Sequence, residues 1–137
     1  MNLLTTILVI NTQQDSNQAL CQTLETNGYQ VFVQKFQKEN FHITAQQQNP
    51  DIILLDLCKS KGKAPEICQA VRLCIHAPIV VLSCGGSSEA IAKILDAGAD
   101  DYLVKPISNS ILFASIHKFT WRISHRRNHI SSASPKA

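Results

Sequence analysis

Three polar side chains stand at the ends of short apolar segments that are far apart along the chain. Asp56, Ser83 and Lys105 each close or directly follow such a segment. A carboxylate can accept a phosphoryl group as an acyl phosphate, and a hydroxyl and an ammonium can contact its oxygens. Taken singly, each side chain is more often a helix cap or a solvated surface group. Their matching positions together favour a site for phosphoryl transfer centred on Asp56.

The elements that would position these residues alternate between short apolar runs and helix-like stretches. Strands are predicted at 7–10, 29–34, 51–56, 79–82 and 101–104, and helices at 15–27, 37–48, 65–74, 87–97 and 108–124. Strands that are apolar throughout are buried on both faces, which predicts an α/β fold, a (βα)5 doubly wound parallel five-stranded sheet. Ligands of such sheets bind outside the C-terminal ends of the strands. The three polar residues lie at those ends.

Length and composition are those of one globular domain with a real core. The chain has 137 residues, of which 45% are hydrophobic and 17% are charged. No apolar run approaches the roughly 20 residues of a membrane span, and the N-terminus lacks the pattern of a signal peptide. The five cysteines form no CxxC motif. We therefore expect reduced thiols, no disulfide framework and a cytoplasmic location.

The charge is unevenly distributed along the chain. Residues 1–101 carry 7 basic and 10 acidic side chains, which gives −3, whereas residues 102–137 carry 6 basic and no acidic ones, which gives +6. Residues 130–137 have the composition of a frayed tail or of the start of a linker. We predict a domain over residues 1–127, followed at 128–137 by a polar tail or linker.

Two motifs carry a resemblance to a known family. The apolar run from Ile52 to Leu57 contains Asp56, and the stretch from Gly98 to Pro106 reads Gly-Ala-Asp-Asp-Tyr-Leu-Val-Lys-Pro. With these motifs, residues 5 to about 125 resemble the receiver domain of two-component response regulators, which has a flavodoxin-like fold. The resemblance implies that Asp56 is the phosphoacceptor and that Ser83 and Lys105 contact the phosphate. It also implies that Tyr102 is the switch aromatic.

The chain departs from the family after its first strand. Where the family has two adjacent acidic residues, this chain has Asn11 and Thr12. Of the family's metal ligands, only Asp56 and the backbone carbonyl of Cys58 remain. Because Mg²⁺ favours clustered carboxylate oxygens, we expect weak Mg²⁺ binding and impaired Mg²⁺-dependent phosphorylation. Asp15 could approach the site only if the loop path differs.

The loop after Asp56 is unusually basic. Lys59, Lys61 and Lys63 follow within seven residues of the predicted acceptor. These lysines could partly replace a cation or attract an anionic ligand. The plainer interpretation is a solvated basic loop.

The resulting prediction is a signalling receiver that is not an enzyme and acts through protein contacts. The resemblance implies a sensor histidine kinase or another signalling protein as partner. It also implies an output face formed by the helix at 87–97, the strand at 101–104 and the helix at 108–124. We expect Phe113 and Trp121 to stay near the surface of this face and to favour a homodimer.

Two other function classes remain open. The chain could be the N-terminal receiver part of a longer DNA-binding transcriptional regulator, and the length of the gene product would discriminate. Nucleic acid would then bind only through the output domain that follows. A flavodoxin-like enzyme is the second alternative, although no nucleophile–base pair or cofactor loop stands out. Absorbance of a bound flavin would identify such an enzyme.

Overall fold

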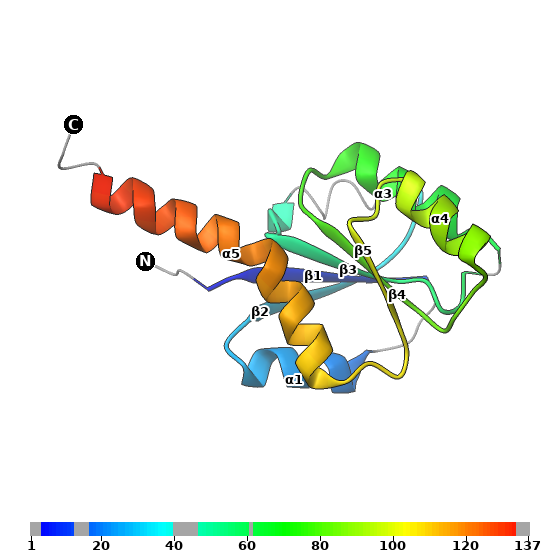
Figure 1. Cartoon of the computed structure of the whole chain (residues 1–137), viewed down its shortest axis with the longest axis horizontal. Helices are drawn as coiled ribbons and strands as arrows, with labels where there is room; N and C mark the ends of the chain where they lie inside the picture. The colour runs from blue at the N-terminus through cyan, green and yellow to red at the C-terminus, as the bar shows by residue number, and fades with distance from the viewer. Residues whose placement is uncertain (1–3, 13–16, 40–46, 61, 134–137) are drawn as a thin grey trace.

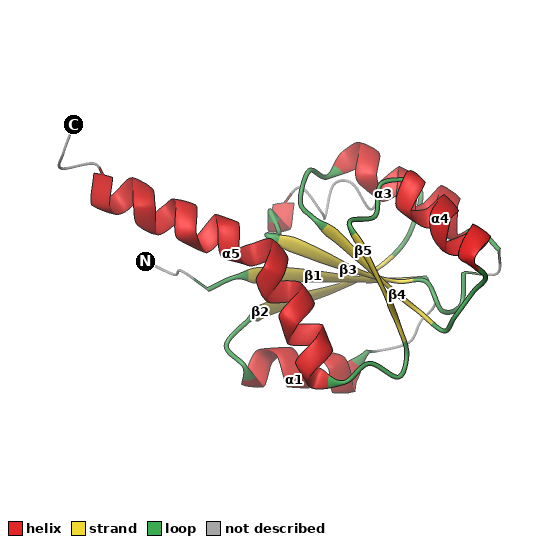
Figure 2. Cartoon of the chain, viewed as in Figure 1, coloured by secondary structure: helices red, strands yellow, loops and turns green. Residues whose placement is uncertain are grey.

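The computed structural model describes residues 4–12, 17–39, 47–60 and 62–133, with side chains described as far as Trp121 (Figure 1). Nine elements have defined bounds in this part of the chain (Figure 2). They are β1 (Thr6–Asn11), α1 (Gln18–Thr26), β2 (Gln30–Lys35), β3 (Ile52–Asp56), α3 (Ala64–Cys74), β4 (Ile79–Ser83), α4 (Ser88–Asp96), β5 (Asp101–Val104) and α5 (Asn109–Ala133).

The five strands form one parallel sheet in the order β2-β1-β3-β4-β5. The prediction of a doubly wound five-stranded sheet is confirmed. The register places Asn11 beside Asp56 at the ends of β1 and β3, and Ser83 beside Val104 at the ends of β4 and β5. Because all strands end at the same edge, the polar residues predicted to gather there do so.

Helices cover both faces of the sheet, and two hydrophobic clusters fill the space between them (Figure 1). Alternate strand residues such as Leu8 and Ile53 pack with α3 and α4, whereas Ile7 and Ile52 pack with α1 and α5. The central strands β1, β3 and β4 are almost wholly buried, while the edge strands β2 and β5 are partly exposed. Burial on both faces explains the continuous apolar runs.

Local signals in the sequence fix several helix ends. The Ser87 hydroxyl accepts a hydrogen bond from the Ala90 N–H at 3.1 Å and so caps α4. Gly98 follows α4 with φ of 120°, a conformation that an L side chain rarely adopts. Pro65 lies in the first turn of α3, as predicted.

Three predicted helix boundaries differ from the structure or lie beyond it. The helix predicted to end at residue 124 continues to Ala133, into the segment expected to be a tail (Figure 1). The segment carries no strong stop signal, because neither Gly nor Pro occurs in the sequence between residues 125 and 133. Residues 37–39 lie outside any helix, and most of the rest of the helix predicted at 37–48 lies outside the described residues. Asp15, where the first helix was predicted to begin, also lies outside them, and α1 begins after Asn17.

Within the described ranges, no helix combines the length and apolar character that a bilayer crossing requires.

Candidate phosphoacceptor site

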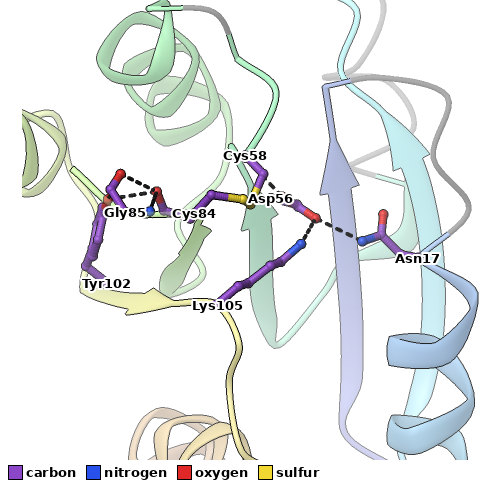
Figure 3. Close-up of a disulfide and its surroundings, with 8 residues drawn as sticks. Asn17, Asp56, Cys58, Cys84, Gly85, Tyr102 and Lys105 are labelled. Atoms are coloured by element: carbon purple, nitrogen blue, oxygen red, sulfur yellow. Dashed lines mark hydrogen bonds and ion pairs between the residues drawn. A yellow bond between two sulfur atoms is a disulfide. The ribbon is translucent and has the colours of Figure 1, made fainter.

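Asp56 ends the buried strand β3, and only 6% of its surface is exposed. Its Oδ2 accepts hydrogen bonds from Lys105 Nζ at 2.7 Å and from Asn17 Nδ2 at 3.0 Å. Its Oδ1 accepts a third from the Cys58 N–H at 3.1 Å. Lys105, which was expected to contact the phosphate, is therefore paired with the predicted acceptor itself (Figure 3).

Strand pairing explains why Lys105 reaches Asp56. The Lys105 N–H donates to the Ser83 carbonyl at 2.7 Å, which continues the pairing of β5 with β4 past the strand end. The long side chain then spans β4 to reach the end of β3. The Lys105–Pro106 peptide bond is cis.

Two opposing effects set the pKa of Asp56. Burial raises the pKa, because a charged carboxylate loses hydration. The hydrogen bonds from Lys105, Asn17 and the Cys58 N–H, together with the charge of Lys105, outweigh burial and lower the pKa below its ordinary value of 3.8. Asp56 is consequently a carboxylate at neutral pH, already paired with one cation.

The positions that replace the acidic pair lead into a chain of amides. Asn11 Nδ2 donates to Asn17 Oδ1 at 2.8 Å, and Asn17 donates in turn to Asp56. Asn17 has φ of 48°, a left-handed conformation that asparagine tolerates better than most residues. Sequence reasoning missed Asn17. The helix predicted at 15–27 placed Asn17 inside its first turn, so no local signal pointed to this contact. Thr12 lines the same pocket as Asp56.

The polar residues at this edge form two clusters. The first contains Asp56 with Lys105, Asn17 and Cys58, and the second contains Ser83, Gly85 and Tyr102. The Ser83 hydroxyl accepts from the Tyr102 hydroxyl at 2.7 Å and from the Gly85 N–H at 3.3 Å, and it lies 3.2 Å from the Gly85 carbonyl, to which it can donate. Tyr102 is half-buried, and its ring packs against the hydrophobic core residues beneath α3 and α4. Its ring is therefore turned inward, toward the end of β4.

A disulfide joins Cys58 to Cys84, between the two clusters (Figure 3). The prediction that all cysteines are reduced is wrong for this pair. The Leu57 N–H donates to the Leu82 carbonyl at 2.9 Å, so the pairing with β4 continues one residue past the end of β3, directly before Cys58. The two Cα atoms then lie 5.1 Å apart, within the range that a disulfide spans. A separation of 26 residues along the chain concealed this proximity.

Comparison with known proteins identifies the family. A model of the response regulator receiver domain matches residues 7–117, more than half of the chain. The chain belongs to this family. The receiver is 31% identical over 130 residues to the KDP operon transcriptional regulatory protein KdpE of Escherichia coli (strain K12), an alignment that covers 95% of this chain and 55% of KdpE.

Other relatives agree. The phosphate regulon transcriptional regulatory protein PhoB of the same strain is 32% identical over 124 residues, covering 86% of this chain and 52% of PhoB. The receiver thus spans about half the length of these curated relatives. A two-component response regulator from Clostridium difficile has a similar structure, with a TM-score of 0.75 and 28% identity, over 87% of this chain and 98% of the other.

The donor atoms at this receiver's site suit Mg²⁺ poorly. A pocket of about 140 Å³ at the strand ends is lined by Asn11, Thr12, Asp56, Cys58, Lys59, Cys84 and Lys105. Among these residues Asp56 supplies the sole carboxylate, and both of its oxygens already accept hydrogen bonds. Two lysines line the pocket and would repel a divalent cation. No group of three metal-binding side chains gathers in the described residues.

The remaining predicted residues divide into several environments. Lys59 lines the pocket and Lys63 precedes α3, whereas Lys61 lies outside the described residues.

Phe113 was predicted near the surface of the output face, but it is half-buried and stacks on Tyr29 with ring centroids 6.4 Å apart. Phe113 faces Tyr29, the residue before β2, because α5 and α1 pack on the same face of the sheet. Trp121 is 48% exposed, as predicted.

Proposed function

We propose that this receiver of two-component signalling uses Asp56 as its phosphoacceptor and transmits its signal mainly through protein contacts. The observation that carries the proposal is the 2.7 Å ion pair between Asp56 and Lys105 at the shared edge of the sheet. A buried carboxylate with an adjacent ammonium can attack phosphorus while the ammonium neutralises the transferred oxygens. We assign no other reaction to the chain.

Impaired dependence on Mg²⁺ follows from the charges at the site. Asn11 and Thr12 bring no charge where the family has two acidic residues. The amide of Asn17 and the ammonium of Lys105 both donate to Oδ2 of Asp56, and the Cys58 N–H donates to Oδ1, so each oxygen that a metal would need already accepts a hydrogen bond. Lys59 and Lys105 instead favour an anion in the pocket, such as the phosphoryl group of a small donor.

Phosphoryl labelling tests this function. Incubation with acetyl phosphate, followed by intact-protein mass measurement, should show slow addition of one phosphoryl group that Asp56→Asn abolishes. The labelling rate should change little between chelator and millimolar Mg²⁺. The variant Asn11→Asp with Thr12→Asp should restore a clear dependence on Mg²⁺. Labelling that persists in Asp56→Asn would refute the assignment of the acceptor.

A sensor histidine kinase, or another signalling protein, is the proposed partner, and a cytoplasmic location follows from that role. KdpE and PhoB are transcriptional regulatory proteins, and the alignments cover only about half of their length. The alternative is therefore that the receiver regulates transcription through a DNA-binding domain that follows it. Sequencing the complete transcript would distinguish the two, because a short reading frame leaves no room for an output domain.

Homodimerisation through α4, β5 and α5 is a further part of the proposal. Leu95, Val104 and Ile111 are exposed apolar side chains, one from each of these elements. Sedimentation at micromolar concentration without phosphodonor should show a dimer that Ile111→Glu weakens. Leu73→Glu is the matched control, because Leu73 is 80% exposed on α3, outside this face. A monomer at that concentration would contradict the dimer.

A further inference from the structure

The Cys58–Cys84 disulfide connects the two halves of the candidate site. Cys58 lies two residues after Asp56, and Cys84 directly follows Ser83. The bridge therefore links the loop that follows β3 to the loop that follows β4 (Figure 3). A bond at this place can affect both the acceptor and the hydroxyl expected to contact phosphate.

Each cysteine adjoins a different group of hydrogen-bonded residues. The backbone N–H of Cys58 donates to Asp56 Oδ1 at 3.1 Å. Cys84 is held between Ser83 and Gly85, and these two residues are bonded to each other and to the Tyr102 hydroxyl. While the bridge is intact, the β4 loop cannot move away from the β3 loop.

We propose that Cys58 and Cys84 form a redox-sensitive dithiol–disulfide site that controls phosphorylation of Asp56. In the oxidised receiver the bridge holds the β4 loop and retains Ser83 on Tyr102. In the reduced receiver the loop is released, and Ser83 can turn to the phosphoryl group. The inference rests on the proposed role of Asp56 as acceptor.

The chemistry is thiol–disulfide exchange with a small dithiol or a partner protein dithiol as reductant. One reductant thiolate attacks the sulfur of Cys84, the S–S bond breaks, and Cys58 leaves as a thiolate. The second reductant thiol then displaces Cys84 from the mixed disulfide, so two electrons pass to the receiver. The reductant becomes a disulfide, and its two protons end on Cys58 and Cys84. A small disulfide such as oxidised glutathione reverses the reaction.

The surroundings of the bridge suit this exchange. Cys84 is exposed, which gives the attacking thiolate access, and Cys58 is half-buried. The pocket that Cys58 lines is also lined by two cations, Lys59 and Lys105, and by one carboxylate, that of Asp56. Nearby cations stabilise a leaving thiolate. Cys68 is different, because burial raises the pKa of its thiol to about 11. The bridged pair is thus the favoured site of oxidation.

The proposed location supports a regulatory role for the bridge. Disulfides of cytoplasmic proteins are usually transient and take part in catalysis or redox sensing. The sheet and its two hydrophobic clusters already provide a core. A permanent cross-link at the functional edge would restrict the loops that a phosphorylated receiver has to rearrange.

The test compares labelling of the full chain in two verified redox states. The receiver is equilibrated with oxidised glutathione or with dithiothreitol, its thiols are counted by alkylation and mass measurement, and acetyl phosphate is added. We expect labelling at least fivefold faster in the reduced protein. Cys84→Ser should label like the reduced protein in both conditions, and Cys21→Ser should keep the redox response. Equal rates in the two verified states, or failure of oxidised glutathione to form the bridge, would overturn the inference.

A second measurement separates this inference from the proposed function. If neither state is labelled, the role of Asp56 fails, and amide NMR signals then decide the redox proposal. Reduction should shift the signals of Gly85 and Tyr102 as well as those of the two cysteines. Unchanged signals at Gly85 and Tyr102 would overturn the coupling between the bridge and the second cluster.

Discussion

Replacing Asp56 with asparagine should destabilise the receiver at neutral pH. The substitution keeps the shape and one oxygen, but it removes the charge that Lys105 and Asn17 contact. Because both carboxylate oxygens accept hydrogen bonds, the new NH2 group would also face at least one donor. A hydrogen bond to a charged group contributes about 1.5–3 kcal/mol and a neutral one about 0.5–1.5 kcal/mol. The difference is about 1 kcal/mol for each of the two contacts.

The contribution of Lys105 needs a discount for solvent. Its side chain is 36% exposed and can turn partly to water when its partner is lost. We therefore expect a loss of about 1–2 kcal/mol in the free energy of unfolding. For a chain of this size, the melting temperature would fall by about 3–6 °C. Where the family has three clustered carboxylates, these repel one another, and removing one charge would raise stability. Here the acidic pair is absent, so removing the charge of Asp56 should lower stability.

Urea denaturation at pH 7, with the disulfide oxidised, measures this loss. Asp96→Asn is the control, because Asp96 is exposed at the end of α4 and should change stability by less than about 0.5 kcal/mol. The reasoning would be refuted by an Asp56→Asn receiver as stable as the wild type, or more stable.

The pH dependence of the loss has a defined sign. Because the folded pKa of Asp56 is lowered, its stabilisation is complete above the unfolded pKa. It is lost as the pH falls through the folded value, which lies below 3.8. The difference between the wild type and Asp56→Asn should therefore stay constant from pH 7 to pH 5 and shrink only in more acidic solution. A difference that disappears by pH 6 would contradict the lowered pKa.

Three further outcomes can be measured. Asn11→Asp combined with Thr12→Asp should raise Mg²⁺ affinity at least about tenfold in calorimetry, since each close charge contributes on the order of 1–4 kcal/mol; unchanged affinity would contradict this. Reduction of the Cys58–Cys84 bridge should lower the free energy of unfolding by about 3 kcal/mol in urea, because it releases a closed loop; no change on verified reduction would refute it. Tyr102→Phe should lower the free energy of unfolding by about 1 kcal/mol, because it removes the hydroxyl that contacts Ser83 and Gly85; a stability equal to the wild type would show that these contacts contribute little.

The sequence by itself determined the fold and the main members of the site. Continuous apolar runs, the serine before α4 and the glycine after it are local signals, because burial and capping depend on neighbouring residues. Parallel strands end at one edge of a sheet, so the approach of Asp56, Ser83 and Lys105 to that edge followed from their positions at the strand ends. The loss of the acidic pair was also visible, because Asn11 keeps its position at the end of the first strand.

Only the tertiary structure decided how the side chains at that edge are paired. The donation from Asn17 to Asp56 depends on the left-handed conformation of Asn17, for which the sequence gives no periodic signal. The disulfide between Cys58 and Cys84 depends on the register of β3 against β4 beyond their ends. Strand patterns determine which residues reach the edge, but loop paths determine which atoms meet there. Those paths depend on contacts between segments that are far apart along the chain.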